Sequence, residues 1–133
     1  MTDRELLELA AKAAGISWKP AETDAGKMCE LKFGLWLNIV QEPTESTRRR
    51  FNPLNDDGDA LRLAVKLRID IDHGSPLDNS RYVCASCCGI EMVRDAVRAV
   101  EEFEDDVGVQ RAYSTRRAIV RAAAELAKQE KSL

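Results

Sequence analysis

The sequence has no long apolar run, no excess of positive charge and only one histidine. No stretch reaches the roughly eighteen consecutive apolar residues of a transmembrane helix. Twenty Lys and Arg residues stand against 23 Asp and Glu residues, and the formal net charge of −3 argues against a protein that coats nucleic-acid phosphates. Residues 1–8 lack a basic segment followed by an apolar one, so we expect a cytoplasmic protein without a secretory signal or membrane contact.

The composition is that of one ordinary globular domain. Of the 133 residues, 44% are hydrophobic and 32% are charged, which excludes a disordered chain. We predict a single domain over residues 1–133. Its N-terminal part, residues 1–50, contains a helix, a short strand and an exposed connection, and residues 51–133 form an α-β-β-β-α core.

Caps and hydrophobic periodicity define the elements of the N-terminal part. Thr2 and Glu5 have the spacing of a capping box, and the apolar residues that follow predict a helix over residues 3–14 that ends at Gly15. The rest is predicted as a loop over residues 17–30, a strand over 31–40 and an exposed connection over 41–50.

The C-terminal part combines two helices with a meander of strands. A helix is predicted to start near Asp56, and the final helix to run from Thr115 to about Glu130 with Ser114 as its cap. Between them, strands are predicted over residues 67–72 and 82–87. Residues 92–103 have the local pattern of a helix, but a strand over about 96–103 would complete the sheet. The expected class is α+β, with a small antiparallel sheet of three or four strands flanked by three helices.

Two arginines at the predicted start of the final helix oppose its macrodipole. Either an external phosphate or carboxylate compensates for them, or they pair with the acidic residues that precede them. The candidate anion-binding or partner-binding residues are Ser114, Thr115, Arg116, Arg117 and Arg121. The candidate acidic face for a partner consists of Glu101, Glu102, Glu104, Asp105 and Asp106.

A cysteine cluster is the second unusual feature. Cys84, Cys87 and Cys88 contain half of a zinc motif, which Cys29 or the single histidine, His73, could complete. A strand would place Cys84 and Cys87 on opposite faces, however, and structural zinc motifs usually show two spaced pairs. We therefore expect free cysteines in the core, with no metal and no cofactor.

The sequence shows no catalytic motif. It has no P-loop, dinucleotide fingerprint or nucleophile elbow, and no catalytic constellation is evident around His73, so we expect a protein that is not an enzyme. Trp18, Trp36 and Phe51 are either core residues or interface anchors.

Three segments carry a family resemblance. Residues 51–54, 57–67 and 116–125 resemble a family of small tailed-phage and prophage proteins described as a phage α-β-α sandwich domain, with NinX-type relatives. The similarity extends over residues 51–130 and, more loosely, over 3–18. It implies helices that flank an antiparallel sheet and a phage accessory role, and it assigns no catalytic residues.

A second resemblance is to double-stranded-RNA-binding domains. Their order is helix, three strands, helix, and their last helix opens with basic residues that meet phosphates. Arg116, Arg117 and Arg121 would occupy those positions here, whereas the acidic residues over 101–106 depart from the pattern.

These features support three hypotheses of function. The first is a phage-type protein that binds a host macromolecule, such as an inhibitor of an anti-phage CRISPR effector. The second is a nucleotide-sequestering or anion-sequestering module, possible as a homodimer, that uses residues 114–117 with Arg81 or Arg111. The third is a regulatory nucleic-acid binder that uses Arg48, Arg49 and Arg50 with the final helix.

Overall fold

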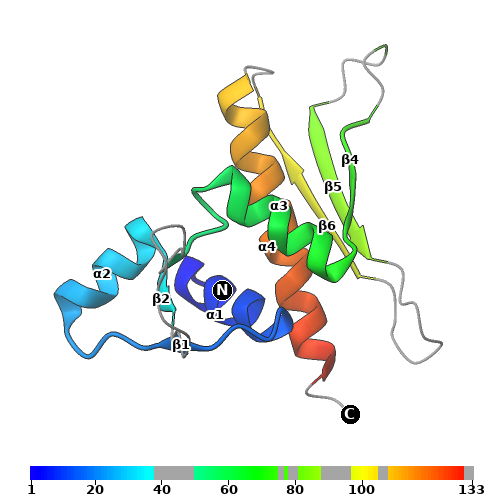
Figure 1. Ribbon diagram of the computed structural model, residues 1–133. Helices are drawn as coiled ribbons and strands as arrows, with labels where there is room; N and C mark the ends of the chain where they lie inside the picture. Colours follow the sequence, from blue (N-terminus) through cyan, green and yellow to red (C-terminus); the bar gives the residue numbers. More distant parts are fainter. Residues whose placement is uncertain (38–49, 75–76, 78–80, 88–96, 105–107, 131–133) are drawn as a thin grey trace.

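The computed structural model describes residues 1–37, 50–74, 77, 81–87, 97–104 and 108–130, and the statements on structure below concern these residues (Figure 1). The elements in chain order are α1 (Asp3–Ala13), β1 (Trp18–Lys19), α2 (Asp24–Phe33), β2 (Leu35–Leu37), β3 (Arg50–Phe51), α3 (Asp57–Leu67), β4 (Asp70–Asp72), β5 (Tyr82–Cys87), β6 (Val97–Glu102) and α4 (Gly108–Glu130).

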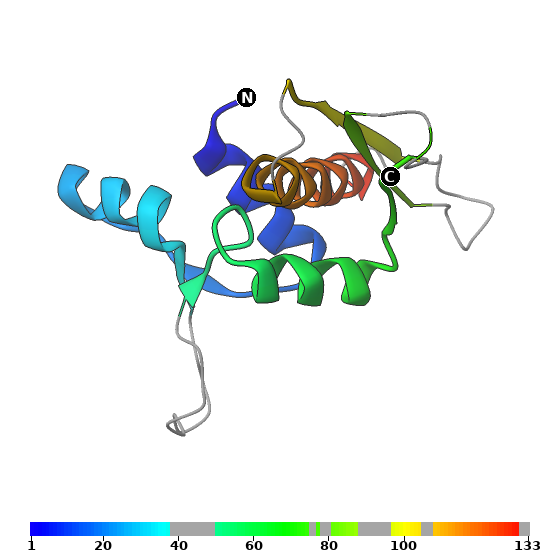
Figure 2. The same ribbon diagram turned by 90° about the horizontal axis from the view of Figure 1, so that it is seen from above.

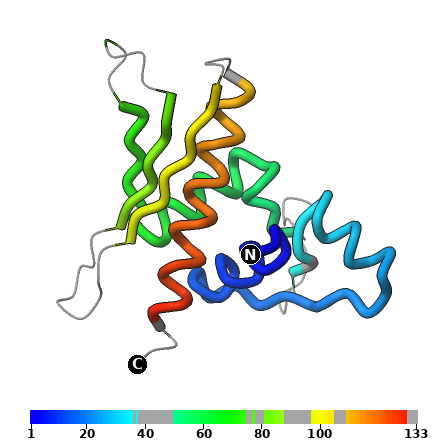
Figure 3. The backbone as a smooth tube through the Cα atoms, turned by 180° about the vertical axis from the view of Figure 1, so that it is seen from behind, coloured from blue at the N-terminus to red at the C-terminus, as the bar shows by residue number. Residues whose placement is uncertain are grey.

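Helix α4 lies at the centre of the molecule. It contacts α1, α3, β5 and β6, and α1 and the sheet of β4, β5 and β6 lie on opposite sides of it (Figures 1 and 3). Small residues make this central position possible, because Ala118, Ala122 and Ala123 are completely buried and allow neighbouring elements to come close. The core formed around α4 also includes Leu7 of α1 and Leu63 of α3.

The larger sheet is antiparallel, with the order β4-β5-β6. Ala85 pairs with Ala99, and both are buried on the face toward α4, as are Val83 and Val97. The alternate residues of β6, such as Arg98, are exposed on the other face, which no helix of the described chain covers (Figure 2). The strand predicted over about 96–103 is confirmed as β6, because its alternating burial suits a sheet with one covered face.

The smaller sheet, of order β1-β2-β3, joins the N-terminal elements to the start of α3. Leu35 of β2 pairs with Phe51 of β3, and both side chains are buried. Gly34 separates α2 from β2 and has a positive φ of 96°. A Cβ atom there would collide with the Phe51 carbonyl oxygen, so this position requires glycine.

The predicted caps of α1 and α3 are confirmed. The Glu5 amide donates to Thr2 Oγ1 at 3.2 Å, and the Thr2 amide donates to Glu5 Oε2 at 3.0 Å. Gly15 has a φ of 69°, as expected after the end of α1. Asp56 caps α3 by accepting from the Asp59 amide at 2.8 Å.

The prediction of a loop over residues 17–30 is wrong. This segment contains β1 and most of α2, whose cap Thr23 accepts from the Gly26 amide at 3.0 Å. Apolar periodicity could not predict α2, because Glu30 is its only buried residue. The strand predicted over 31–40 is confirmed only at 35–37; residues 31–33 belong to α2, and residues 38–49 lie outside the described ranges.

The final helix also begins earlier than predicted, at Gly108 and not at Thr115. Ser114 is buried within the helix, and the Thr115 hydroxyl donates to the Arg111 carbonyl oxygen at 2.7 Å. Such back-bonding inside a helix uses the same residue types that cap helix starts. The predicted first turn therefore lies about two turns inside α4.

The α+β class with a small antiparallel sheet is confirmed. The described residues contain four helices, whereas three were predicted, because α2 was missed. From α3 to α4 the order is helix, three strands, helix, as the resemblance to RNA-binding domains implies. No helix in the described ranges is sufficiently long and apolar to span a membrane.

Candidate functional site

The predicted anion-binding arginines pair with carboxylates of the protein itself. Arg116 donates to Asp57 Oδ1 at 2.6 Å and to the Leu54 carbonyl oxygen at 2.9 Å. Arg117 donates to Asp3 Oδ1 at 2.9 Å, and this hydrogen bond raises the pKa of the Arg117 guanidinium. Asp3 and Asp57 stand in the first turns of α1 and α3, where negative charge complements the helix dipole. The two arginines thus connect the starts of both helices to α4.

Arg121 makes a third connection, between α4 and β6. Its Nη1 donates to Glu101 Oε1 at 2.7 Å and to the Val100 carbonyl oxygen at 2.9 Å. The Nε atom of Arg117 lies 3.6 Å from the same Glu101 oxygen. Internal pairing, the alternative left open by the sequence, is therefore present for all three arginines, although Asp3 and Asp57 lie far from the acidic run that was expected to provide it.

The structure distributes the five predicted anion-binding residues over different surroundings. Ser114 is only 4% exposed. Thr115 and Arg116 line a pocket against α3, whereas Arg117 and Arg121 face carboxylates of α1 and β6. None of them lies at the start of α4. Of the predicted acidic face, Glu101 is engaged by α4, Glu102 and Glu104 are exposed, and Asp105 and Asp106 lie outside the described residues.

The described cysteines do not converge on a common point. Cys84 and Cys87 are buried; Cys84 Sγ accepts from Arg98 Nε at 3.1 Å, and Cys87 Sγ donates to the Leu67 carbonyl oxygen at 3.5 Å. Cys29 is exposed on α2, and Cys88 lies outside the described residues. In the described ranges, no three His, Cys, Asp or Glu side chains are grouped to hold a metal ion.

His73 instead takes part in a pocket of about 370 Å³ between α3, β4 and α4. Leu61, Ile71 and Ile119 belong to its apolar lining. Arg111, in the first turn of α4, lies at the pocket with Nη1 3.4 Å from His73 Nδ1 and 3.3 Å from the His73 carbonyl oxygen. This pocket brings together Arg111, Thr115 and Arg116, which were all named from the sequence, but His73 was not predicted to lie there.

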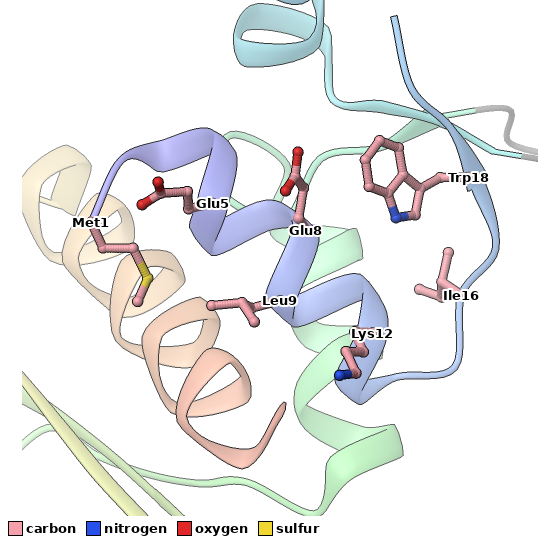
Figure 4. A pocket seen from close by; sticks show the side chains of 7 residues that line it. All are labelled: Met1, Glu5, Glu8, Leu9, Lys12, Ile16 and Trp18. Carbon is pink, nitrogen blue, oxygen red and sulfur yellow. The ribbon is translucent and has the colours of Figure 1, made fainter. Parts of the chain in front are cut away.

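A wider groove of about 640 Å³ follows the outer face of α1 (Figure 4). Met1, Leu9, Ile16 and Trp18 form its apolar part. Its carboxylates already have partners, because Glu5 belongs to the capping box of α1 and Glu8 accepts from Arg4 at 2.9 Å. Of the three aromatic residues named from the sequence, Trp18 is half-buried along this groove and Phe51 is in the core. The groove has apolar walls but no charge arrangement that selects a ligand.

Helix α2 presents three exposed apolar side chains. It projects from the body of the molecule (Figures 1 and 2), and Met28, Leu31 and Phe33 are 72%, 43% and 50% exposed. Glu30 attaches the helix: it accepts from the Ala21 amide at 2.6 Å and lies 3.2 Å from Arg4 Nη1. This surface was not predicted, although Thr23 followed by Asp24 is a signal for a helix start.

Compared with models of known families, with curated proteins and with solved structures, the chain has no significant match. Function must therefore be inferred from the surfaces themselves. Helix α2 and the pocket at His73 differ in kind, since the first is an exposed helix with apolar side chains and the second a small concavity with mainly apolar walls and a few charged groups.

Proposed function

We propose that this protein is a non-enzymatic binding protein that docks on a partner protein through the outer face of α2. The observation that carries this proposal is the exposure of Met28, Leu31 and Phe33 on a helix that buries only Glu30. Exposed apolar side chains that cluster on one element mark interaction surfaces. Removing them from water would contribute about 25 cal/mol for each Å² of apolar area.

The weak attachment of α2 favours the same conclusion. A helix of ten residues is marginal by itself in water. Its polar contacts with the body include the Arg4–Glu30 ion pair, the hydrogen bond from the Ala21 amide to Glu30, and the long hydrogen bonds, of 3.4 and 3.5 Å, that the Asn52 and Asn55 side chains donate to the last turn of α2. A partner that covers the outer face would stabilise the helix and bury its apolar residues together. Met28 and Leu31 are three positions apart, which is the spacing of helix residues that insert into a groove.

Charge on α2 specifies the kind of groove. Lys27 and Lys32 are exposed on the helix, and Lys32 Nζ lies 5.2 Å from the centre of the Phe33 ring. The Arg50 guanidinium lies 5.9 Å from the same ring. Phe33 is therefore an apolar anchor between two cations. A complementary partner has an apolar groove with carboxylates at its rim.

The sequence resemblance suggests where this partner belongs. The resemblance of residues 51–54, 57–67 and 116–125 to small phage proteins favours a host protein as the target. A component of a host defence against phages, such as a CRISPR effector, is the first partner to test, and the consequence of binding would be inhibition.

A double substitution tests this proposal. Met28→Glu with Leu31→Glu places two charges on the outer face of α2, and both positions are exposed enough to leave the fold intact. We expect the wild-type chain to bind a purified host CRISPR effector that has an apolar groove with carboxylates at its rim, and to protect a phage from that effector. The double variant should lose both binding and protection.

The matched control is Val65→Glu, at a residue of α3 that is 69% exposed. It should bind and protect as the wild type does. If the double variant keeps binding and protection, or if Val65→Glu loses them equally, α2 is not the docking surface.

A further inference from the structure

We infer that the pocket between α3, β4 and α4 is a binding site for a small organic anion, with the anionic head at Arg111 and an apolar body against Leu61, Ile71 and Ile119. This site is separate from α2 and does not depend on the docking proposed above. The described residues that line it all belong to the C-terminal part of the chain.

The size and walls of the pocket suit a small molecule. Its volume of about 370 Å³ lies within the range of small-molecule sites, and such sites combine apolar walls with a few fixed polar groups. Leu61 is 60% exposed and forms the outer wall. An apolar body that covers Leu61 would remove from water a surface that the fold itself leaves exposed.

The charge of the lining favours an anion. Among the described residues that line the pocket, Arg111 and Arg116 carry positive charge and Asp57 alone carries negative charge. Asp57 is itself engaged by Arg116. Two guanidinium groups at one concavity offer several N–H donors in fixed geometry, and charge-assisted hydrogen bonds from such groups to a carboxylate or phosphate are strong.

The two arginines have different roles. Arg116 is only 17% exposed in its side chain and is committed to Asp57 and the Leu54 carbonyl oxygen, so it fixes the wall. Arg111 is oriented by stacking, because its guanidinium carbon lies 4.8 Å from the centre of the Phe103 ring. Its Nη1 also faces His73. A guanidinium held in one plane is suited to the planar or multidentate oxygens of a carboxylate or phosphate.

Binding of four probes to the full-length protein tests this inference. The probes are 1-naphthoate, 1-naphthyl phosphate, neutral 1-naphthamide and inorganic phosphate, and the readout is the NMR shift of backbone amides during titration. We expect saturable shifts at Leu61, Ile71 and Ala112 with the two aromatic anions. Naphthamide, which lacks the charge, should bind about tenfold more weakly, since charge-assisted hydrogen bonds are the stronger ones. Whichever of naphthoate and naphthyl phosphate binds more tightly identifies the head group.

Inorganic phosphate tests whether the pocket recognises the anionic group alone or the anionic group together with an apolar body. It has the head without the body, and it should bind more weakly than either aromatic anion because Leu61 and Ile119 stay uncovered. If phosphate binds as tightly as naphthyl phosphate, the apolar walls have no part in recognition and the inference is overturned.

Three substitutions complete the test. Arg111→Gln should weaken naphthoate about tenfold and leave naphthamide unchanged, whereas Leu61→Gln should weaken both. Arg68→Gln removes an exposed arginine that does not line the pocket, and it should change neither. Equal binding of naphthoate and naphthamide, shifts centred elsewhere, or an Arg111→Gln variant with wild-type affinity would each refute the site. The Met28→Glu, Leu31→Glu variant should bind naphthoate normally, which separates this result from the fate of the docking proposal.

Discussion

Helices α2 and α4 use charged and apolar residues in opposite ways. On α4, Arg116, Arg117 and Arg121 point to carboxylates of α3, α1 and β6 and hold the fold together. On α2, the apolar residues Met28 and Leu31 face outward, and a buried glutamate makes the main connection to the body. Residue type alone therefore does not locate function in this chain: the arginines named as candidate anion ligands pair with carboxylates of the protein, and the helix without an amphipathic pattern exposes apolar side chains.

The largest expected contrast comes from the same substitution on each helix. Leu126 of α4 is 2% exposed, and Leu31 of α2 is 43% exposed. Leu126→Ala should lower the free energy of unfolding by about 2–5 kcal/mol, because it leaves a cavity in the core. Leu31→Ala should lower it by about 0.5 kcal/mol or less. Urea unfolding of both variants measures the difference, and equal losses would show that α2 is as firmly packed as α4.

A smaller effect is expected when α2 loses its attachment. Glu30→Gln removes the charge that faces Arg4 but retains an acceptor for the Ala21 amide. We expect the amides of α2 to exchange with solvent about tenfold faster, since local opening becomes easier, while those of α4 change little. Hydrogen exchange followed by NMR measures both helices in one sample. Uniform acceleration over the two would mean that α2 opens only with the whole molecule.

The smallest effect is expected at the ion pair between α1 and α4. Arg117→Gln should reduce the free energy of unfolding by about 0.5–1 kcal/mol, because Asp3 is half-exposed and solvent screens the pair. The hydrogen bond that Arg117 donates to Asp3 raises the pKa of Arg117. The contribution of this pair to the free energy of unfolding is therefore complete below the ordinary pKa of arginine, and it is lost only as the pH rises through the higher pKa of the folded state.

Between about pH 6 and 9, Arg117 keeps its charge because its pKa is raised above the ordinary value of arginine. The stability difference between the wild type and Arg117→Gln should therefore stay constant over that interval, as measured by urea unfolding at several pH values. Asp3→Asn is the complementary variant. Arg117→Gln should lower the free energy of unfolding less in the Asp3→Asn background than in the wild type.

Elements marked by side chains that bond to the nearby backbone could be predicted from the sequence. Prediction was wrong where one residue type occurs both at the start of a helix and inside it. Thr2 with Glu5 predicted the start of α1, and Asp56 that of α3, because these side chains bond to the backbone nearby. Ser114 and Thr115 were interpreted as the start of a helix, but in α4 the Thr115 hydroxyl bonds to the preceding turn. A hydroxyl residue serves either purpose, and only the surrounding packing decides between them.

The candidate site was predicted in part for a similar reason. Arg116, Thr115 and Arg111 were all named, and the structure brings them to one pocket. Asp57, the carboxylate partner of Arg116, comes from α3, and His73, which contacts Arg111, follows β4. No local spacing reveals contacts between segments so far apart in the chain. The surface on α2 had no apolar periodicity to indicate it, because periodicity reports which face is buried and α2 buries almost none.

Gly34 has a consequence for engineering. It lies between α2 and β2, at a point where a side chain would collide with the Phe51 carbonyl oxygen. Backbone geometry at Gly34 therefore fixes the direction of α2 relative to β2. The outer side chains of α2 take no part in fixing it. A library that varies residues 27, 28, 31 and 32 while retaining Gly34 would therefore display new binding specificities on an unchanged scaffold.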